Sequence, residues 1–201
     1  PRIVVVTTSY PEYEGDAQGH FVASEVRQLA QQGDVTVLAP GVARRALGSE
    51  TVVSLGGGEA FGFPGALARL REDPRRLLAA SQFVRAARRW LRREPKPARL
   101  LAHFLLPCGV PIATRATTTG TELEIVVHGS DARLFAALPG VGRSLIGAEL
   151  LRSGARLRFV SSELERLFLG GLGDAQRQRL QPFCRVEPCS IDVPAPLTRA
   201  G

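Results

Sequence analysis

The chain has 201 residues, of which 44% are hydrophobic and 22% charged, the composition of a globular protein with enough material for one sizeable core. No apolar run reaches the roughly 18–20 residues of a membrane-spanning helix, and the N-terminus lacks a signal-peptide pattern, so we expect a cytoplasmic protein. The net charge of +7, with Lys96 the only lysine among 26 basic residues, favours anionic ligands or lipid surfaces. Nucleic acid is not expected, because the chain has no recognition motif and few aromatic residues.

The first forty residues predict a β-loop-α-β unit with two parallel strands. A continuous apolar strand is expected over residues 2–8 and a helix from Phe21 to about Ala30, with Gly33 as its stop signal. The second strand covers residues 35–39. A right-handed crossover should join the two strands.

The next part of the chain predicts a third strand at residues 51–55, a glycine turn at 56–58, and a loop with a short helix at 61–70. A long helix is expected over residues 73–93. Its predicted apolar stripe consists of Leu77, Ala80, Val84, Ala87 and Leu91. Arginines surround the stripe, so that the helix presents either a solvated basic face or a surface that rests on anionic lipid.

Strands and helices alternate through the remaining residues. Strands are expected at residues 98–102, 125–127, 156–160 and 185–187; helices at 110–118, 143–152 and 174–180; a capping box at 162–165; and a loop at 134–141. Alternation along the whole chain predicts an α/β fold, a Rossmann-like three-layer α/β/α arrangement with a mainly parallel sheet.

All three histidines fall in loops that follow predicted strands: His20, His103 and His128. A histidine at a strand end can act as a base, bind a hydroxyl or phosphate, or simply bond a backbone carbonyl. Gly19 would let a phosphate approach the start of the first helix. Asp131 either caps the following helix or binds a substrate hydroxyl. The three cysteines (Cys108, Cys184 and Cys189) have no metal-site spacing, and we expect reduced thiols.

Five segments together resemble the N-terminal half of retaining GT-B glycosyltransferases of family 4. They are GDAQGHFV (15–22), VTVLAP (35–40), HFLLPCG (103–109), HGSD (128–131) and FVSSEL (159–164). The resemblance implies a Rossmann-like, acceptor-side domain at residues 1–192, with 193–201 beginning an interdomain linker. The family usually has Pro-Asn-Gly-Val/Ile-Asp at the crossing, whereas this chain has PCSID at 188–192. The C-terminal donor-binding domain would be absent, and the 201 residues inactive alone.

The same resemblance implies a catalytic role for His128 at the transferred sugar or acceptor. Gly19 would approach the donor diphosphate, while His20, His103, Gly129 and Asp131 would line the substrate side. No cofactor or metal is implied, since the nucleotide sugar is a co-substrate. The partners would be the donor, a carbohydrate or lipid-linked acceptor, and the second domain. Separately from the resemblance, the arginine-rich helix at 73–93 gives the expectation of a peripheral contact with an anionic membrane at the inner face.

Two other functions are compatible with the same residues. The chain is alternatively a stand-alone α/β module that binds an anionic small molecule or a carbohydrate. A nucleotide-sugar epimerase of similar fold would also need a second domain, and it requires a pair of catalytic carboxylates for which the sequence offers no convincing candidate.

Overall fold

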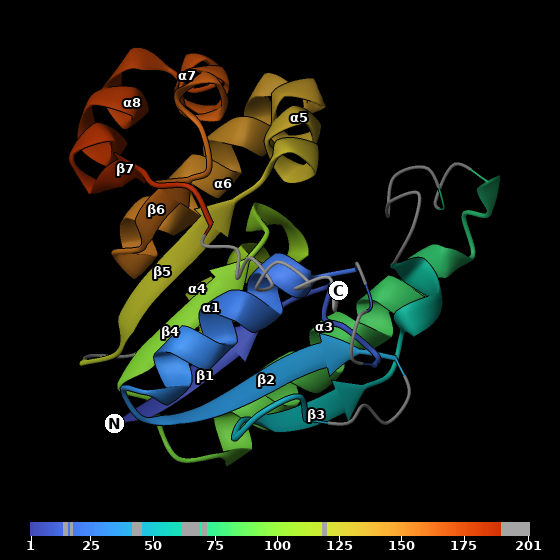
Figure 1. Cartoon of the computed structure of the whole chain (residues 1–201). Coiled ribbons are helices and arrows are strands. Elements are labelled where there is room, and N and C mark those ends of the chain that lie inside the picture. The colour runs from blue at the N-terminus through green and yellow to red at the C-terminus, as the bar shows by residue number, and fades with distance from the viewer. Residues whose placement is uncertain are drawn as a thin grey trace, which may run out of the picture.

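The computed structural model describes residues 1–13, 16, 18–41, 46–61, 69, 72–117 and 120–189. In this part of the chain, seven strands form one all-parallel sheet in the order β3-β2-β1-β4-β5-β6-β7 (Figure 1). The strands are β1 Arg2–Val6, β2 Asp34–Pro40, β3 Thr51–Leu55, β4 Arg99–His103, β5 Glu122–Val127, β6 Arg156–Phe159 and β7 Cys184–Val186. The predicted Rossmann-like α/β fold is confirmed.

The helices alternate with these strands along the chain. They are α1 His20–Ala30, α3 Arg76–Arg93, α4 Thr114–Ala116, α5 Gly129–Ala137, α6 Gly140–Ser153, α7 Ser162–Gly170 and α8 Asp174–Leu180, with shorter turns η1 Gly58–Ala60, η2 Leu105–Ala113 and η3 Gln181–Phe183. None of the described helices is both long and apolar enough to cross a membrane.

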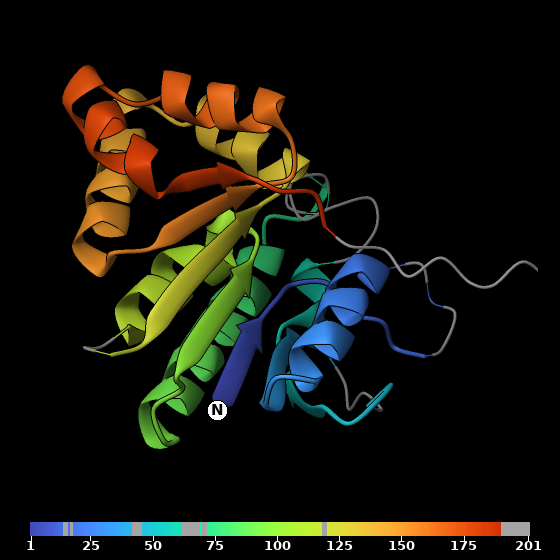
Figure 2. The same cartoon turned by 60° about the vertical axis from the view of Figure 1, so that its left-hand side comes forward.

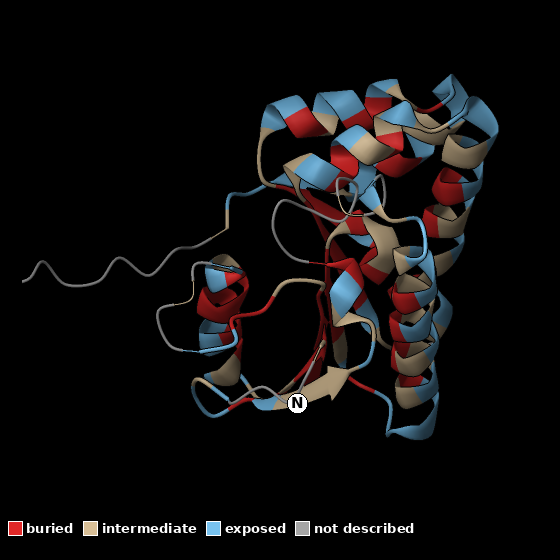
Figure 3. Cartoon of the chain, turned by 90° about the vertical axis from the view of Figure 1, so that its right-hand side faces the viewer, coloured by how far each residue is buried: buried red, intermediate tan, exposed pale blue. Residues whose placement is uncertain are grey.

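Opposite faces of the sheet bury separate cores. On one face, Ile3 and Val5 of β1 pack with Val22 and Val26 of α1. On the other face, alternate strand residues pack against α3 and the helices after β5, as Figures 2 and 3 show. The division follows from chain direction: the step from β1 to β2 and the steps from β3 through β7 run in opposite senses across the sheet. Right-handed crossovers therefore place their helices on opposite faces.

Helix α3 packs through a stripe that keeps Ala87 and Leu91 of the predicted one but is rotated away from Leu77. Its buried side chains are Ala79, Phe83, Ala87 and Leu91, spaced four residues apart, whereas Leu77 is 59% exposed. Phe83 is fully buried and meets Phe61 edge to face at 5.5 Å between ring centroids. An aromatic ring buries more apolar surface than a leucine, so the helix turns Phe83 inward and Leu77 outward.

The segment after β4 is not the regular helix predicted for residues 110–118. Residues Leu105–Ala113 form a π-type segment with non-helical dihedral angles at Leu106 and Val110, and only Thr114–Ala116 continue as α-helix. The bonds preceding Pro107 and Pro111 are cis. Each proline lacks a backbone N–H, which prevents a continuous helical ladder. Residues 118 and 119 lie outside the described residues, as do most of 61–70 and all of 190–201.

The predicted loop at residues 134–141 is mostly helical. Helix α5 ends at Ala137 and α6 begins at Gly140, so only two residues separate them. The sequence HGSD therefore opens α5 and is not an extended loop. At α7 the cap is Ser161, one residue earlier than predicted, and its Oγ accepts from the Leu164 N–H at 3.4 Å.

Candidate functional site

The predicted site residues gather at the carboxyl edge of the sheet, beside β1. The chain leaves β1 towards β2 on one side, while β4 pairs with β1 on the other. Ligands of open α/β sheets bind in the crevice that forms outside the strands at such a reversal. The start of α1, the end of β4 and the start of α5 all lie at this edge.

His103 and His128 contact each other directly. His103 Nδ1 lies 3.3 Å from His128 Nε2, and the two rings stack with centroids 5.5 Å apart. His103 is the last residue of β4 and has 0% exposed surface, whereas His128 is only partly buried at the start of α5. His103 therefore has no surface to offer a ligand, and any effect it has on one passes through His128.

Two phenylalanines surround the His128 ring. Phe21 of α1 and Phe104 after β4 have ring centroids 4.9 and 4.6 Å from it. Phe104 adopts φ 77°, which is uncommon for a bulky residue and costs on the order of 1–3 kcal/mol. Its N–H donates to the Val126 carbonyl at 2.9 Å and its own carbonyl accepts from Gly109 at 3.0 Å, so the conformation is held on both sides.

A buried carboxylate lies behind the two histidines. Glu25 Oε2 of α1 is 3.6 Å from His103 Nε2, and neither atom has a hydrogen-bond partner. Arg158 of β6 holds the other oxygen of Glu25 and also pairs with Glu124 at 2.8 Å. A carboxylate facing His103 Nε2 favours the proton on that nitrogen. His103 Nδ1 is then an acceptor, and His128 Nε2–H is the donor towards it.

Both imidazoles are neutral near pH 7. Burial, followed by the charge interaction with His128 and then Arg158, holds the pKa of His103 well below its ordinary value. Burial and then Arg158 lower the pKa of His128 to about 4. A neutral imidazole can exchange hydrogen bonds with a hydroxyl but brings no positive charge to a phosphate. The pair therefore brings no positive charge to this edge of the sheet.

Asp131 ties the segment after β4 to the start of α5. Its Oδ1 accepts from the His128 N–H at 2.8 Å and its Oδ2 accepts from the Leu105 N–H. The side chain is 3% exposed, and burial raises its pKa to about 7 against the backbone N–H groups that favour the carboxylate. Of the two predicted roles, this geometry accounts for the capping one. A bond to a substrate hydroxyl stays a prediction.

Gly19 is required by packing between two loops. It precedes α1 with φ +71°, and a Cβ added there would lie 2.6 Å from the Ser9 carbonyl carbon. No other residue fits this approach without strain. Packing against Ser9 therefore explains why residue 19 is a glycine, and the approach of a phosphate stays a separate prediction.

His20 and Gly129 occupy the first positions of their helices. His20 opens α1, is exposed, and meets Phe21 edge to face at 5.8 Å between ring centroids. Phe21 in turn contacts His128, so His20 lies at the same edge of the sheet as the other two histidines. Gly129 opens α5 and is half-buried.

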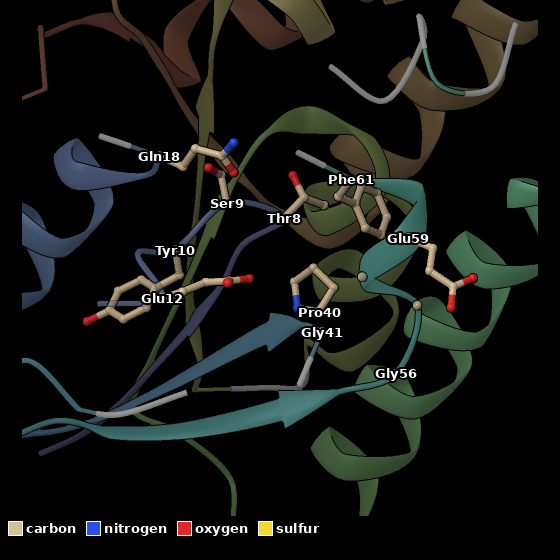
Figure 4. Close-up of a pocket in the computed structure, with 12 residues that line it drawn as sticks. Thr8, Ser9, Tyr10, Glu12, Gln18, Pro40, Gly41, Gly56, Glu59 and Phe61 are labelled. Carbon is tan, nitrogen blue, oxygen red and sulfur yellow. The ribbon is translucent and has the colours of Figure 1, made fainter. Parts of the chain in front are cut away.

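A cavity of about 400 Å³ lies at the same edge, over β1, β2 and β3 (Figure 4). Its described lining comprises Thr8, Ser9, Tyr10, Glu12, Gln18, Pro40, Gly41, Gly56, Gly57, Gly58, Glu59 and Phe61. These side chains offer hydroxyl, amide, carboxylate and aromatic groups, and no lysine, arginine or histidine is among the described lining residues. Gln18 precedes Gly19, so the cavity adjoins the start of α1.

The cavity was not predicted from the sequence, because glycines after a strand are also typical of simple turns. A Cβ on Gly58 would lie 2.6 Å from Gly41 Cα, and the loops after β2 and β3 therefore touch. That contact joins residues 17 apart in sequence. The signal in the sequence was the placement of Pro40-Gly41 and Gly56-Gly57-Gly58 directly after neighbouring strands.

The described residues include no group of three histidine, cysteine, aspartate or glutamate side chains that could hold a metal ion. All three cysteines are free, and burial raises the pKa of Cys108, of Cys184 to about 12 and of Cys189 to about 11. They are therefore thiols near pH 7. Comparison with known proteins adds no identification: no protein-family model and no curated protein matches the chain.

Proposed function

We propose that this chain is the N-terminal, acceptor-side domain of a glycosyltransferase that moves a sugar from a nucleotide-sugar donor to an acceptor. The proposed enzyme is a retaining GT-B glycosyltransferase of family 4, and the 201 residues are inactive alone. The observation that carries the proposal is one juxtaposition. The glycine start of α1, the His103–His128 pair and Asp131 meet at the edge where the strand order reverses.

The composition of the cavity supports a hydroxyl-rich ligand on this side. Ser9, Thr8 and Gln18 provide groups that both donate and accept hydrogen bonds, and Glu12 provides further acceptors. A sugar offers many hydroxyl partners to such groups and a ring face to aromatic side chains. A phosphate would find no cationic side chain among the described lining residues. The acceptor therefore presents a carbohydrate portion to this cavity.

Individual residues take distinct parts in the proposal. His128, neutral and held by its neighbours, contacts the transferred sugar or the acceptor. His103 and Asp131 position it from buried sites. The N–H groups at the start of α1, after Gly19, face the donor diphosphate. His20, exposed at the same helix end, lies on the substrate side.

One observation favours the alternative of a stand-alone binding module. The chain's own residues form the cavity, so ligand affinity would need no second domain. The neutral lining favours a carbohydrate over an anionic ligand in this case as well. The two functions differ in whether a nucleotide sugar is consumed.

The test measures release of nucleoside diphosphate from UDP-glucose, UDP-N-acetylglucosamine and GDP-mannose. The natural polypeptide that carries these residues is compared with the 201-residue chain. The proposal expects consumption of one donor by the natural polypeptide and none by the chain alone. It also expects Gln18→Ala to lower kcat/KM by about tenfold, the loss of one or two good hydrogen bonds. Gln178→Ala on α8, far from the edge, is the control. Carbohydrate binding by the chain without any donor consumption by the natural polypeptide would favour the module.

A further inference from the structure

The outward face of α3 carries a continuous basic stripe. Residues 79, 83, 87 and 91 face the core, so the opposite side of the helix points to solvent. At 3.6 residues per turn, Leu78, Arg85, Arg89 and Arg92 fall within about 60° of one another on that side. All four are exposed. The stripe runs from Leu78 to Arg92, 14 residue steps or about 21 Å along the helix axis.

The arginines of this stripe have no carboxylate partner among the described residues. Elsewhere many arginines are paired: Arg99 with Glu124, Arg152 with Glu149, and Arg156 with Glu122, for example. On α3 itself the only described ion pair joins Arg76 to Glu72, at its first turn. The stripe is therefore a local excess of positive charge on a chain whose net charge is already +7.

Two leucines extend this basic face at the N-terminal end of α3. Leu77 is 59% and Leu78 67% exposed, among the most exposed large apolar side chains in the described part of the chain. Adjacent exposed leucines next to a row of arginines form an amphipathic surface. The leucines can enter hydrocarbon while the guanidinium groups reach the headgroups.

We propose that this stripe, Leu77–Leu78 with Arg85, Arg89 and Arg92, docks on an anionic lipid bilayer. Charge complementarity identifies the partner as anionic, and the leucine pair favours a bilayer over nucleic acid. Phosphates of a nucleic-acid backbone would satisfy the arginines but offer the leucines no apolar surface.

The docked end of α3 lies beside the cavity. A Cβ on Gly57 would be 2.1 Å from the Ala79 carbonyl oxygen, so the cavity wall touches the first turn of the helix next to Leu78. Ala79 faces the core, so the cavity wall contacts the side of α3 opposite the stripe. The docking itself does not rest on the proposed function, because it requires no ligand in the cavity.

Co-sedimentation with vesicles tests the docking. The chain is mixed with phosphatidylcholine vesicles with and without 40% phosphatidylglycerol at about 0.1 M salt. We expect binding only to the anionic vesicles. Each arginine near such a surface contributes about fivefold, so the triple variant Arg85→Gln, Arg89→Gln, Arg92→Gln should bind on the order of 100-fold more weakly.

A charge-matched control separates docking from general attraction. Arg133→Gln, Arg166→Gln, Arg179→Gln removes the same charge from α5, α7 and α8. This variant should weaken binding less than about threefold, since none of the three arginines belongs to the stripe and charges that do not contact the surface are screened by salt. The proposal would be overturned if the two triple variants lost the same amount of vesicle-binding affinity, or if the unmodified chain did not bind anionic vesicles. Duplex DNA that displaces the chain from the vesicles at equimolar phosphate would do the same.

A fluorescent reporter tests the leucine contact. Leu78→Trp, made with Trp90→Phe to remove the only native tryptophan, should shift its emission to shorter wavelength on anionic vesicles. Leu145→Trp in the same background is the matched control, because Leu145 of α6 is 68% exposed but lies on another helix. A shift of equal size at Leu145, or none at Leu78, contradicts insertion of this end of α3.

Discussion

The neutrality of His128 predicts a loss of stability at low pH. Burial and then Arg158 lower its pKa from 6.5 to about 4 in the folded chain. The unfolded chain therefore takes up the proton first as the pH falls. The histidine's contribution to stability is complete above pH 6.5 and is lost as the pH falls towards 4. The difference between the unfolded and folded pKa values of His128 corresponds to about 3.4 kcal/mol of unfolding free energy, of which about 2.5 kcal/mol is lost at pH 4.5.

The measurement is urea unfolding of the unmodified chain and of His128→Gln at several pH values from 7.5 to 4.5. Glutamine does not titrate, so the stability difference between the two proteins should change by about 2.5 kcal/mol over this range. The change should favour the variant at low pH. His103 acts in the same direction, because His128 contributes to the lowering of its pKa. A pH-independent stability difference, or His128 ring signals that titrate near pH 6.5 by NMR, would refute the reasoning.

Three further substitutions test other parts of the structure by urea unfolding. Gly19→Ala should lower the free energy of unfolding by at least about 1–3 kcal/mol, because Gly19 has a positive φ and contacts the loop after β1. Gly170→Ala, with open space around it, should lower the free energy of unfolding by less than about 0.5 kcal/mol. Equal effects of the two substitutions would contradict the packing explanation. Phe83→Ala should lower the free energy of unfolding by about 3–5 kcal/mol and Leu77→Ala by less than about 0.5 kcal/mol. The reverse order would mean that α3 packs through the stripe predicted from sequence, with Leu77 inward. Arg158→Met should lower the free energy of unfolding by about 3–5 kcal/mol, because it leaves the buried Glu25 without its cation and removes one of the arginine partners of Glu124; an unchanged stability would show that Glu25 is protonated or hydrated.

The strands of the sheet could be predicted from sequence because each is a short, continuous apolar run. Such runs are typical of parallel strands buried on both faces. The cap at Asp131 could be predicted from sequence, and the structure has Asp131 accepting the N–H of His128 at the start of α5. The extent of the helix could not, because Pro139-Gly140 indicated a loop at 134–141, whereas α5 continues to Ala137.

The surroundings of the histidines could be predicted only in part. Strand ends of a parallel sheet share one edge, so the proximity of His103 and His128 follows from the fold class. The carboxylate behind them does not, because Glu25 lies on a helix and its partner Arg158 is 133 residues away. Pairing at that distance is determined by how α1 packs across the sheet.

The most direct test of the proposed function is transfer of labelled sugar from a nucleotide sugar to an acceptor by the natural polypeptide that carries these residues. We predict transfer with the unmodified polypeptide, a loss of at least about tenfold in kcat/KM for His128→Gln, and no loss for Gln178→Ala, which lies outside the carboxyl edge. Absence of transfer with every donor tested would contradict the glycosyltransferase proposal. Undiminished transfer by His128→Gln would contradict the role assigned to the histidine that opens α5.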